Sequence, residues 1–123
     1  MILAAALAAQ VALAPCNLEN VPADARCGTI TVRENRDARS GRTIDLSIIV
    51  LPALDADKVP DPFFMLAGGP GDAPSFNARF FSRVFNDIRK KRDIVLVDLR
   101  GTGKSAPLCR SSRHRQVCAA LLS

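Results

Sequence analysis

The chain has 123 residues, enough for one ordinary domain, and 48% of them are apolar, which excludes wholesale disorder. The net charge is +5, Trp and Tyr are absent, and the six Phe residues all lie in apolar patterns that predict burial. Recognition of nucleic acid needs basic residues beside exposed aromatic side chains or a known module, so we expect no nucleic-acid partner.

The first fourteen residues, "MILAAALAAQVALA", carry no charge and are nearly all Ala, Leu, Ile and Val. A helix that crosses a bilayer needs about 20 residues, so we expect no stable membrane insertion. The segment ends in Ala12-Leu13-Ala14, small residues of the kind that signal peptidase reads, although no basic segment precedes it. We therefore interpret residues 1–14 as signal-peptide-like and expect export to the periplasm or the medium; a buried helix is the alternative.

Four cysteines agree with export: Cys16, Cys27, Cys109 and Cys118. Of the three pairings that four cysteines allow, pairing of nearest neighbours is the simplest, and free buried thiols are the alternative. No metal site is expected, because there is no Cys-x-x-Cys pair and the single His114 lies in a basic run.

Two segments near the start predict a β-hairpin. In "CGTITVREN" a strand is expected after Gly28, with Ile30 and Val32 on one face. After the polar turn "RDARSGR", every second residue from Ile44 to Val50 is apolar, as in a strand with one buried face.

The middle of the chain predicts a parallel βαβ unit. The short apolar runs "FFMLA" (63–67) and "DIVLVD" (93–98) are typical of strands covered on both faces. Between them a helix is expected over residues 74–89, with Pro74 at its start. Its apolar stripe comprises Phe76, Phe80, Phe81, Val84, Phe85 and Ile88. The crossover between two parallel strands should be right-handed.

Gly103-Lys104-Ser105 has the residues that end a phosphate-binding loop. Such a loop also needs a glycine at position 98, where Asp98 would repel phosphate. The dinucleotide pattern fails as well, because Ala106 stands at the third glycine position. Nucleotide binding is thus disfavoured, and no cofactor is expected.

A nucleophile elbow fits the same segment poorly. Residues 103–107 match only the first half of Gly-x-Ser-x-Gly, and Ser105 does not directly follow the strand. We predict that Ser105 is a turn residue or a helix cap.

The other glycine loop, "LAGGPGD", ends an apolar strand and precedes the helix. Gly68, Gly69 and Gly71 permit positive φ and leave N–H groups uncovered, while Pro70 stiffens the turn. Fixed N–H groups at the carboxyl end of a parallel strand are what an oxyanion hole requires. A plain strand-to-helix turn is the alternative.

The combination "FFMLAGGPGDAP … RDIVLVDLRGTGKSAPLC", with the hairpin before it, resembles the N-terminal part of α/β-hydrolases. More narrowly, it resembles the secreted prolyl-aminopeptidase-like group related to the tricorn-interacting aminopeptidases. The likeness covers about residues 16–109. It implies an incomplete α/β-hydrolase sheet over residues 15–123, made of the hairpin and then the βαβ unit.

The resemblance also implies roles for single residues. One oxyanion N–H would come from Gly68 or Gly69, and relatives often carry His where this chain has Ala67. A loop after the strand at 93–98 would shape the sheet edge and brace the oxyanion loop, with Asp98 and Arg100 pairing with nearby backbone. That loop contributes Asp98, Arg100, Gly101, Gly103 and Ser105.

The resemblance implies an exported serine peptidase or aminopeptidase that acts on short peptides, Pro-containing ones included, or on small esters. The nucleophile, the acid and the histidine of the triad are missing, so we expect this chain to be an N-terminal fragment that is inactive alone. We also expect an unpaired sheet edge beside residues 94–97. A disulfide-stapled exported interaction domain is the alternative.

Overall fold

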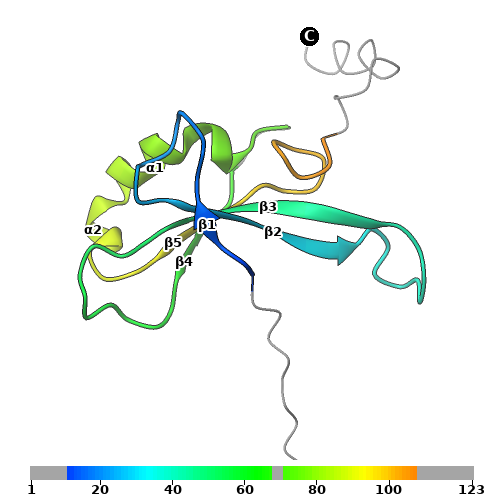
Figure 1. Ribbon diagram of the computed structural model, residues 1–123, viewed down its shortest axis with the longest axis horizontal. Helices are drawn as coiled ribbons and strands as arrows, with labels where there is room; N and C mark the ends of the chain where they lie inside the picture. Colours follow the sequence, from blue (N-terminus) through cyan, green and yellow to red (C-terminus); the bar gives the residue numbers. More distant parts are fainter. Residues whose placement is uncertain (1–10, 68–70, 108–123) are drawn as a thin grey trace, which may run out of the picture.

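The computed structural model describes residues 11–67 and 71–107, which form a mixed α/β fold. Its five-stranded sheet has the order β1-β2-β3-β5-β4 (Figure 1). The strands are β1 (Ala14–Pro15), β2 (Arg26–Arg33), β3 (Thr43–Leu51), β4 (Phe63–Met65) and β5 (Ile94–Val97).

The predicted hairpin is confirmed. β2 and β3 pair antiparallel over the full length of β2, with Ile30 opposite Leu46 and Val32 opposite Ile44. The expected single buried face of β3 is wrong: Ile44 and Ile48 are buried, but so are Ile49 and Leu51 on the opposite face, and these two join the core cluster. β2 begins at Arg26, slightly earlier than expected, because Arg26 and Cys27 pair with β3 on one side and with the short strand β1 on the other.

The predicted βαβ unit is also confirmed. β4 and β5 are parallel, with Phe63 opposite Ile94 and Met65 opposite Leu96, and the helical segment connects them. All other strand pairs are antiparallel, so the sheet is mostly antiparallel with one parallel pair.

The expected unpaired edge beside residues 94–97 is wrong. β3 pairs antiparallel with β5, Leu51 lying opposite Ile94, so β5 has a neighbour on each side. This register buries Ile94 and Leu96 completely, or nearly so. Among the described residues, β4 is the edge strand on this side of the sheet, and it pairs with β5 alone.

The expected single helix is three short pieces: the 3₁₀ turn η1 (Pro74–Asn77), α1 (Ala78–Val84) and α2 (Asn86–Arg89). Pro74 takes the first helical position, as predicted. The interruption at Phe85 is a local distortion. The Phe85 N–H donates to the Phe81 carbonyl at 3.0 Å, and the Arg89 N–H donates to the Phe85 carbonyl at 2.8 Å.

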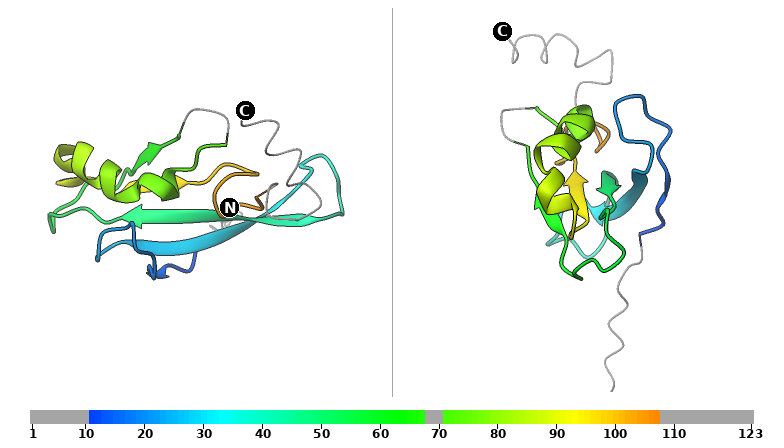
Figure 2. Two further views of the ribbon diagram at one scale, coloured as in Figure 1. Left: turned by 90° about the horizontal axis from the view of Figure 1, so that it is seen from above. Right: turned by 90° about the vertical axis from the view of Figure 1, so that its left-hand side faces the viewer.

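The helical pieces cover one face of the sheet (Figure 2). Phe81 packs there, and the Phe63 ring lies 5.1 Å from the Phe85 ring. The buried cluster consists of Val21, Ala25, Ile49, Leu51, Ala78, Phe81, Ile94 and Leu96.

The expectation that all six Phe residues are buried is wrong. Phe64 and Phe76 are each 58% exposed, and Phe80 is 60% exposed. The expectation that both faces of β4 are covered is also wrong. Phe64 alternates with the inward-facing Phe63 and Met65, and no helix of the described chain lies on that second face.

Cys16 and Cys27 form a disulfide, which confirms nearest-neighbour pairing for this half of the cysteines. The bond closes a segment that carries the buried Val21 and Ala25 onto the helix side of the core. Cys109 and Cys118 lie outside the described residues.

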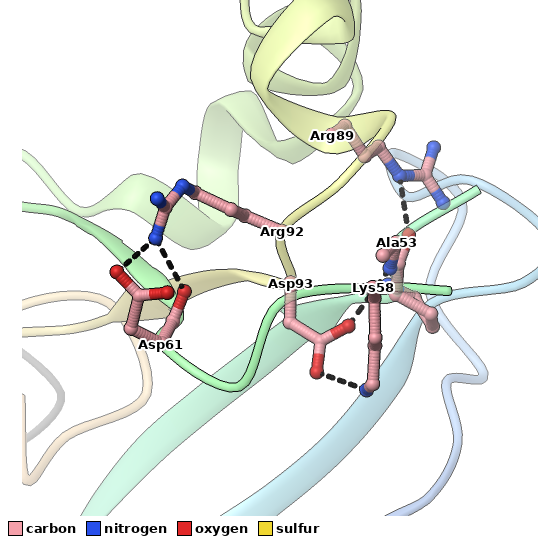
Figure 3. A network of polar contacts seen from close by, with 7 residues as sticks. Ala53, Lys58, Asp61, Arg89, Arg92 and Asp93 are labelled. Carbon is pink, nitrogen blue, oxygen red and sulfur yellow. Dashed lines mark hydrogen bonds and ion pairs between the residues drawn. The ribbon is translucent and has the colours of Figure 1, made fainter. Parts of the chain in front are cut away.

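The loop between β3 and β4 is held by charged groups near the start of β5 (Figure 3). Asp93 accepts hydrogen bonds from the Ala53 N–H at 2.8 Å and from the Lys58 ammonium at 2.6 Å. Arg92 pairs with Asp61, and the buried Arg89 donates to the Pro52 carbonyl at 2.9 Å. The basic residues at the end of α2 and directly after it therefore anchor a polar loop as well as ending the helix.

Removal of the disulfide should destabilise the fold. The bond spans a sequence separation of 11, and cross-links of this size restrict the unfolded chain enough to contribute about 2–3 kcal/mol. We expect Cys16→Ser with Cys27→Ser to lower the free energy of unfolding by that amount in urea titrations. The reference is a Cys109→Ser, Cys118→Ser chain, which keeps only this pair. Equal stability of the two proteins would contradict the structure.

Asp93 should contribute to stability in a pH-dependent way. Burial raises the pKa of Asp93, but the hydrogen bonds from Lys58 and Ala53 together lower it by more than burial raises it. The pKa therefore lies below its ordinary value. The stabilisation is present above the unfolded-state pKa of about 4 and disappears as the pH falls through the lower folded-state value.

We therefore expect Asp93→Asn to lower the free energy of unfolding at neutral pH. It should also flatten the dependence of that free energy on pH between about pH 5 and about pH 2. Asp57→Asn is the matched control: a hydrogen bond from Lys91 lowers the pKa of Asp57, but its carboxylate is exposed and screened by water. If Asp57→Asn lowered the free energy of unfolding more than Asp93→Asn does, the stabilising role of Asp93 would be refuted.

Candidate functional site

The candidate site lies where β4 and β5 end, and two loops leave the sheet there on the same side (Figures 1 and 2). Of the first loop, Gly68, Gly69 and Pro70 lie outside the described residues. Gly71 has a φ of +82°, in the region that favours glycine, as predicted. From Gly71 the chain passes through Asp72 to the start of η1.

Asp98 joins the two loops. It directly follows β5, its side chain is 1% exposed, and it accepts three hydrogen bonds. The Ser75 N–H donates to Oδ1 at 3.0 Å, the Ser75 hydroxyl to Oδ2 at 2.7 Å, and the Lys104 N–H to Oδ2 at 3.1 Å. One buried carboxylate therefore fixes both the start of η1 and the turn after β5.

The turn after β5 closes on itself around this carboxylate. The Gly101 N–H donates to the Ser105 carbonyl at 2.8 Å, and the Ser105 N–H donates to the Thr102 carbonyl at 2.8 Å. With Thr102 donating to the Leu99 carbonyl and Lys104 to Asp98, these loop amides point to groups of the chain itself. A phosphate would have to displace them, which agrees with the argument against nucleotide binding.

Gly103 shows how tightly this turn packs. Its φ is +49°, and a Cβ added there would lie 2.2 Å from Oδ2 of Asp98 and 2.7 Å from the Cβ of Ala73. Only glycine allows the turn to pass so close to the carboxylate and to the segment before η1.

Ser105 is a turn residue, as predicted. Its side chain is completely buried, and its hydroxyl accepts a hydrogen bond from the Ser47 N–H of β3 at 2.7 Å. A serine enclosed in this way cannot attack a substrate, so the structure agrees with the rejection of a nucleophile elbow here.

Arg100 reaches the hairpin from the same turn. Its guanidinium donates to the Glu34 carbonyl at 2.6 Å and to the Arg33 carbonyl at 3.0 Å. Pairing of Asp98 and Arg100 with nearby backbone is thereby confirmed, although the two side chains hold different parts of the chain.

Sequence reasoning missed Ser75 and Ser47, the partners of Asp98 and Ser105. The signal for Ser75 is its place directly after Pro74, where a hydroxyl is available at a helix start. Ser47 is a single polar residue within an otherwise apolar stretch of β3, but nothing local indicates that its backbone N–H meets residue 105.

The hydrogen bonds of the site hold a loop in place. The described residues contain no group of three or more His, Cys, Asp or Glu side chains that could bind a metal ion, and His114 lies outside them.

In the part of the chain that the structure describes, no helix has the length and apolar character needed to cross a membrane. No family model and no curated protein matches the chain.

Substitution of Gly103 should test the packing around Asp98. We expect Gly103→Ala to lower the free energy of unfolding by about 2–4 kcal/mol, because the added methyl group meets a buried carboxylate and φ is positive. Gly71→Ala is the matched control, since its φ is also positive, +82°, but no atom lies within 4 Å of the added Cβ. It should cost about 1–2 kcal/mol, the backbone contribution alone. Equal losses in thermal or urea unfolding would show that the close contact does not matter.

Proposed function

We propose that this chain is the N-terminal part of an exported serine hydrolase with an α/β-hydrolase fold, to which it contributes the oxyanion loop. In the parent reaction a serine attacks an amide or ester carbonyl, and water then releases the acyl group from the enzyme. The substrates are short peptides with a free amino end, Pro-containing ones included, or small esters.

The observation that carries the proposal is the bracing of the glycine loop at both ends. Before the loop, Met65 of β4 pairs with Leu96 of β5. After it, Ser75 is bound through its N–H and its hydroxyl to Asp98. Both anchors lie on or next to β5. An oxyanion hole stabilises developing charge only when its donors are held in place beforehand, and this arrangement supports such a role for Gly68 and Gly69.

The proposal assigns no catalysis to the chain by itself. Ser105 is enclosed, and the candidate loops contribute donors without a nucleophile or a base. Oxyanion donors that remain without a triad give only a small residual acceleration, and only when substrate is bound beside them.

A disulfide-stapled exported interaction domain is the second candidate function. It is favoured by the Cys16–Cys27 bond and by the large apolar side chains exposed near β4. The two candidates differ in whether the gene product carries a reactive serine.

The test is to read the DNA downstream of the Ser123 codon in all frames and to express the longest exported product. We expect a Gly-x-Ser-x-Gly segment whose serine reacts with a fluorophosphonate probe, together with hydrolysis of aminoacyl-nitroanilides or small esters. A product with no probe-reactive serine would refute the hydrolase and leave the interaction domain.

In that product, Asp98→Asn should lower kcat by roughly 10²–10³, the loss associated with one misplaced oxyanion donor, while KM changes little. The Asn side chain cannot accept all three hydrogen bonds that Asp98 accepts. Asp72→Asn, at an exposed residue of the same connection, is the control and should retain kcat. A folded Asp98→Asn enzyme with unchanged kcat would refute the bracing role.

A further inference from the structure

The last residues of the signal-peptide-like segment take part in the fold. β1 pairs antiparallel with the first two residues of β2, and Ala14 lies opposite Cys27. Directly after β1, the Cys16 N–H donates to the Ala25 carbonyl at 3.2 Å, and the disulfide joins Cys16 to Cys27. The boundary that the sequence suggests after residue 14 therefore falls inside a strand pair.

The residues before β1 lie against β2 at Gly28. Gly28 is opposite Ile48 of β3, so a side chain at position 28 would point to the sheet face that carries Ile48. A Cβ added there would lie 2.7 Å from the Ala12 carbonyl oxygen, 3.0 Å from Cδ2 of Leu13 and 3.1 Å from Cγ1 of Val11. The shortest of these distances is to backbone, which cannot turn aside as a flexible side chain can. Glycine thus leaves the room that the segment before β1 fills.

This contact lies on the face of the sheet opposite the helices. Ile49 packs with the helices in the core cluster, and its neighbour Ile48 points the other way, where it is 6% exposed. On the same face, Leu13 lines a shallow hollow together with Val50 and Pro52. The segment before β1 therefore covers part of a face that no helix of the described chain covers, and its removal would expose apolar surface to water.

We propose that Val11–Pro15 stay with the mature domain and that the leader is removed before Val11. A signal peptidase hydrolyses one peptide bond there. One water molecule is consumed, the leader receives a new carboxyl end and the domain a new amino end. The inference rests on the export that is part of the proposed function, and it does not depend on hydrolase activity.

Two features oppose a cut after Ala14. The nitrogen of that bond belongs to Pro15, which has no N–H, so a peptidase that binds its substrate as a strand lacks one hydrogen-bond donor there. A cut would also place a positive amino end opposite Arg26 and detach the residues that pack over Gly28. The same small-residue pattern occurs earlier, at Ala6-Leu7-Ala8, where no proline follows.

The processing site is tested by expressing the full chain in a bacterium and measuring the intact mass of the exported product. We expect an amino end at Val11 or earlier. A product that begins anywhere from Ala12 to Cys16 would overturn the inference. It would leave the proposed function standing, because that function is decided by the reactive serine of the longer product.

The packing over β2 is tested by Gly28→Ala in the full chain, since the sign of its effect is decisive. On an uncovered strand, alanine in place of glycine raises stability, because it restricts the unfolded chain. With the segment before β1 in place, the methyl group meets the Ala12 carbonyl, so we expect the melting temperature to fall by about 4–8 °C. A rise would overturn the proposal.

The matched background for this variant is Val11→Gly with Leu13→Gly, which removes two of the three contacts and loosens the segment. In this background we expect Gly28→Ala to lower the melting temperature by about half as much or less, because residues in contact are coupled. Equal losses in the two backgrounds would show that residue 28 does not meet the segment before β1, and would also overturn the proposal.

Discussion

The arrangement around the candidate site depends on one buried carboxylate. Taking Asp98 out of water is unfavourable unless hydrogen bonds compensate for the lost hydration, and three donors do so. Two of these come from Ser75 and one from Lys104, so the requirement to satisfy one group fixes two loops together. The close passage of Gly103 over the same carboxylate follows from that requirement, since any side chain there would displace Asp98 or the segment before η1.

This arrangement explains why the same glycine-rich pattern serves a different purpose from phosphate binding. A phosphate loop turns successive amides toward an anion that arrives from solution. Here the Lys104 amide is turned toward an anion that the chain itself supplies, and neighbouring amides bond to carbonyls of the same turn. Asp98 was the one residue of the motif that conflicted with a phosphate loop, and in the structure it occupies the centre of the turn.

The elements predictable from the sequence are those set by local patterns. The strands at β3, β4 and β5 and Pro74 at a helix start each depend on a few neighbouring residues, and these elements are confirmed. Which faces of the strands are buried was predicted less well, since Ile49 and Leu51 are buried on the second face of β3 and Phe64 is exposed on β4. The sheet edge depends on the register between Leu51 and Ile94, which are distant in sequence, and this was predicted wrongly. The helical stripe was read correctly as apolar, but a stripe does not say which part faces the core, and Phe81 is buried while Phe80 is exposed. In the site, Asp98 and Ser105 were identified, but their partners on η1 and β3 were not, because only the folded chain brings them together.

A small domain has few residues with which to cover its core, and the two edges of this sheet are covered to different degrees. On the β1 side, the chain folds back over the core and the Cys16–Cys27 bond holds it there, which buries Val21 and Ala25. On the β4 side no such closure exists among the described residues, and Phe64 and Phe80 stay exposed. An open strand edge with exposed apolar side chains is unfavourable in water and prone to pairing. In the longer hydrolase proposed above, a further strand would occupy that edge. The exposed apolar side chains of β4 are therefore what the proposed function predicts for this end of the sheet, because the sheet would continue there.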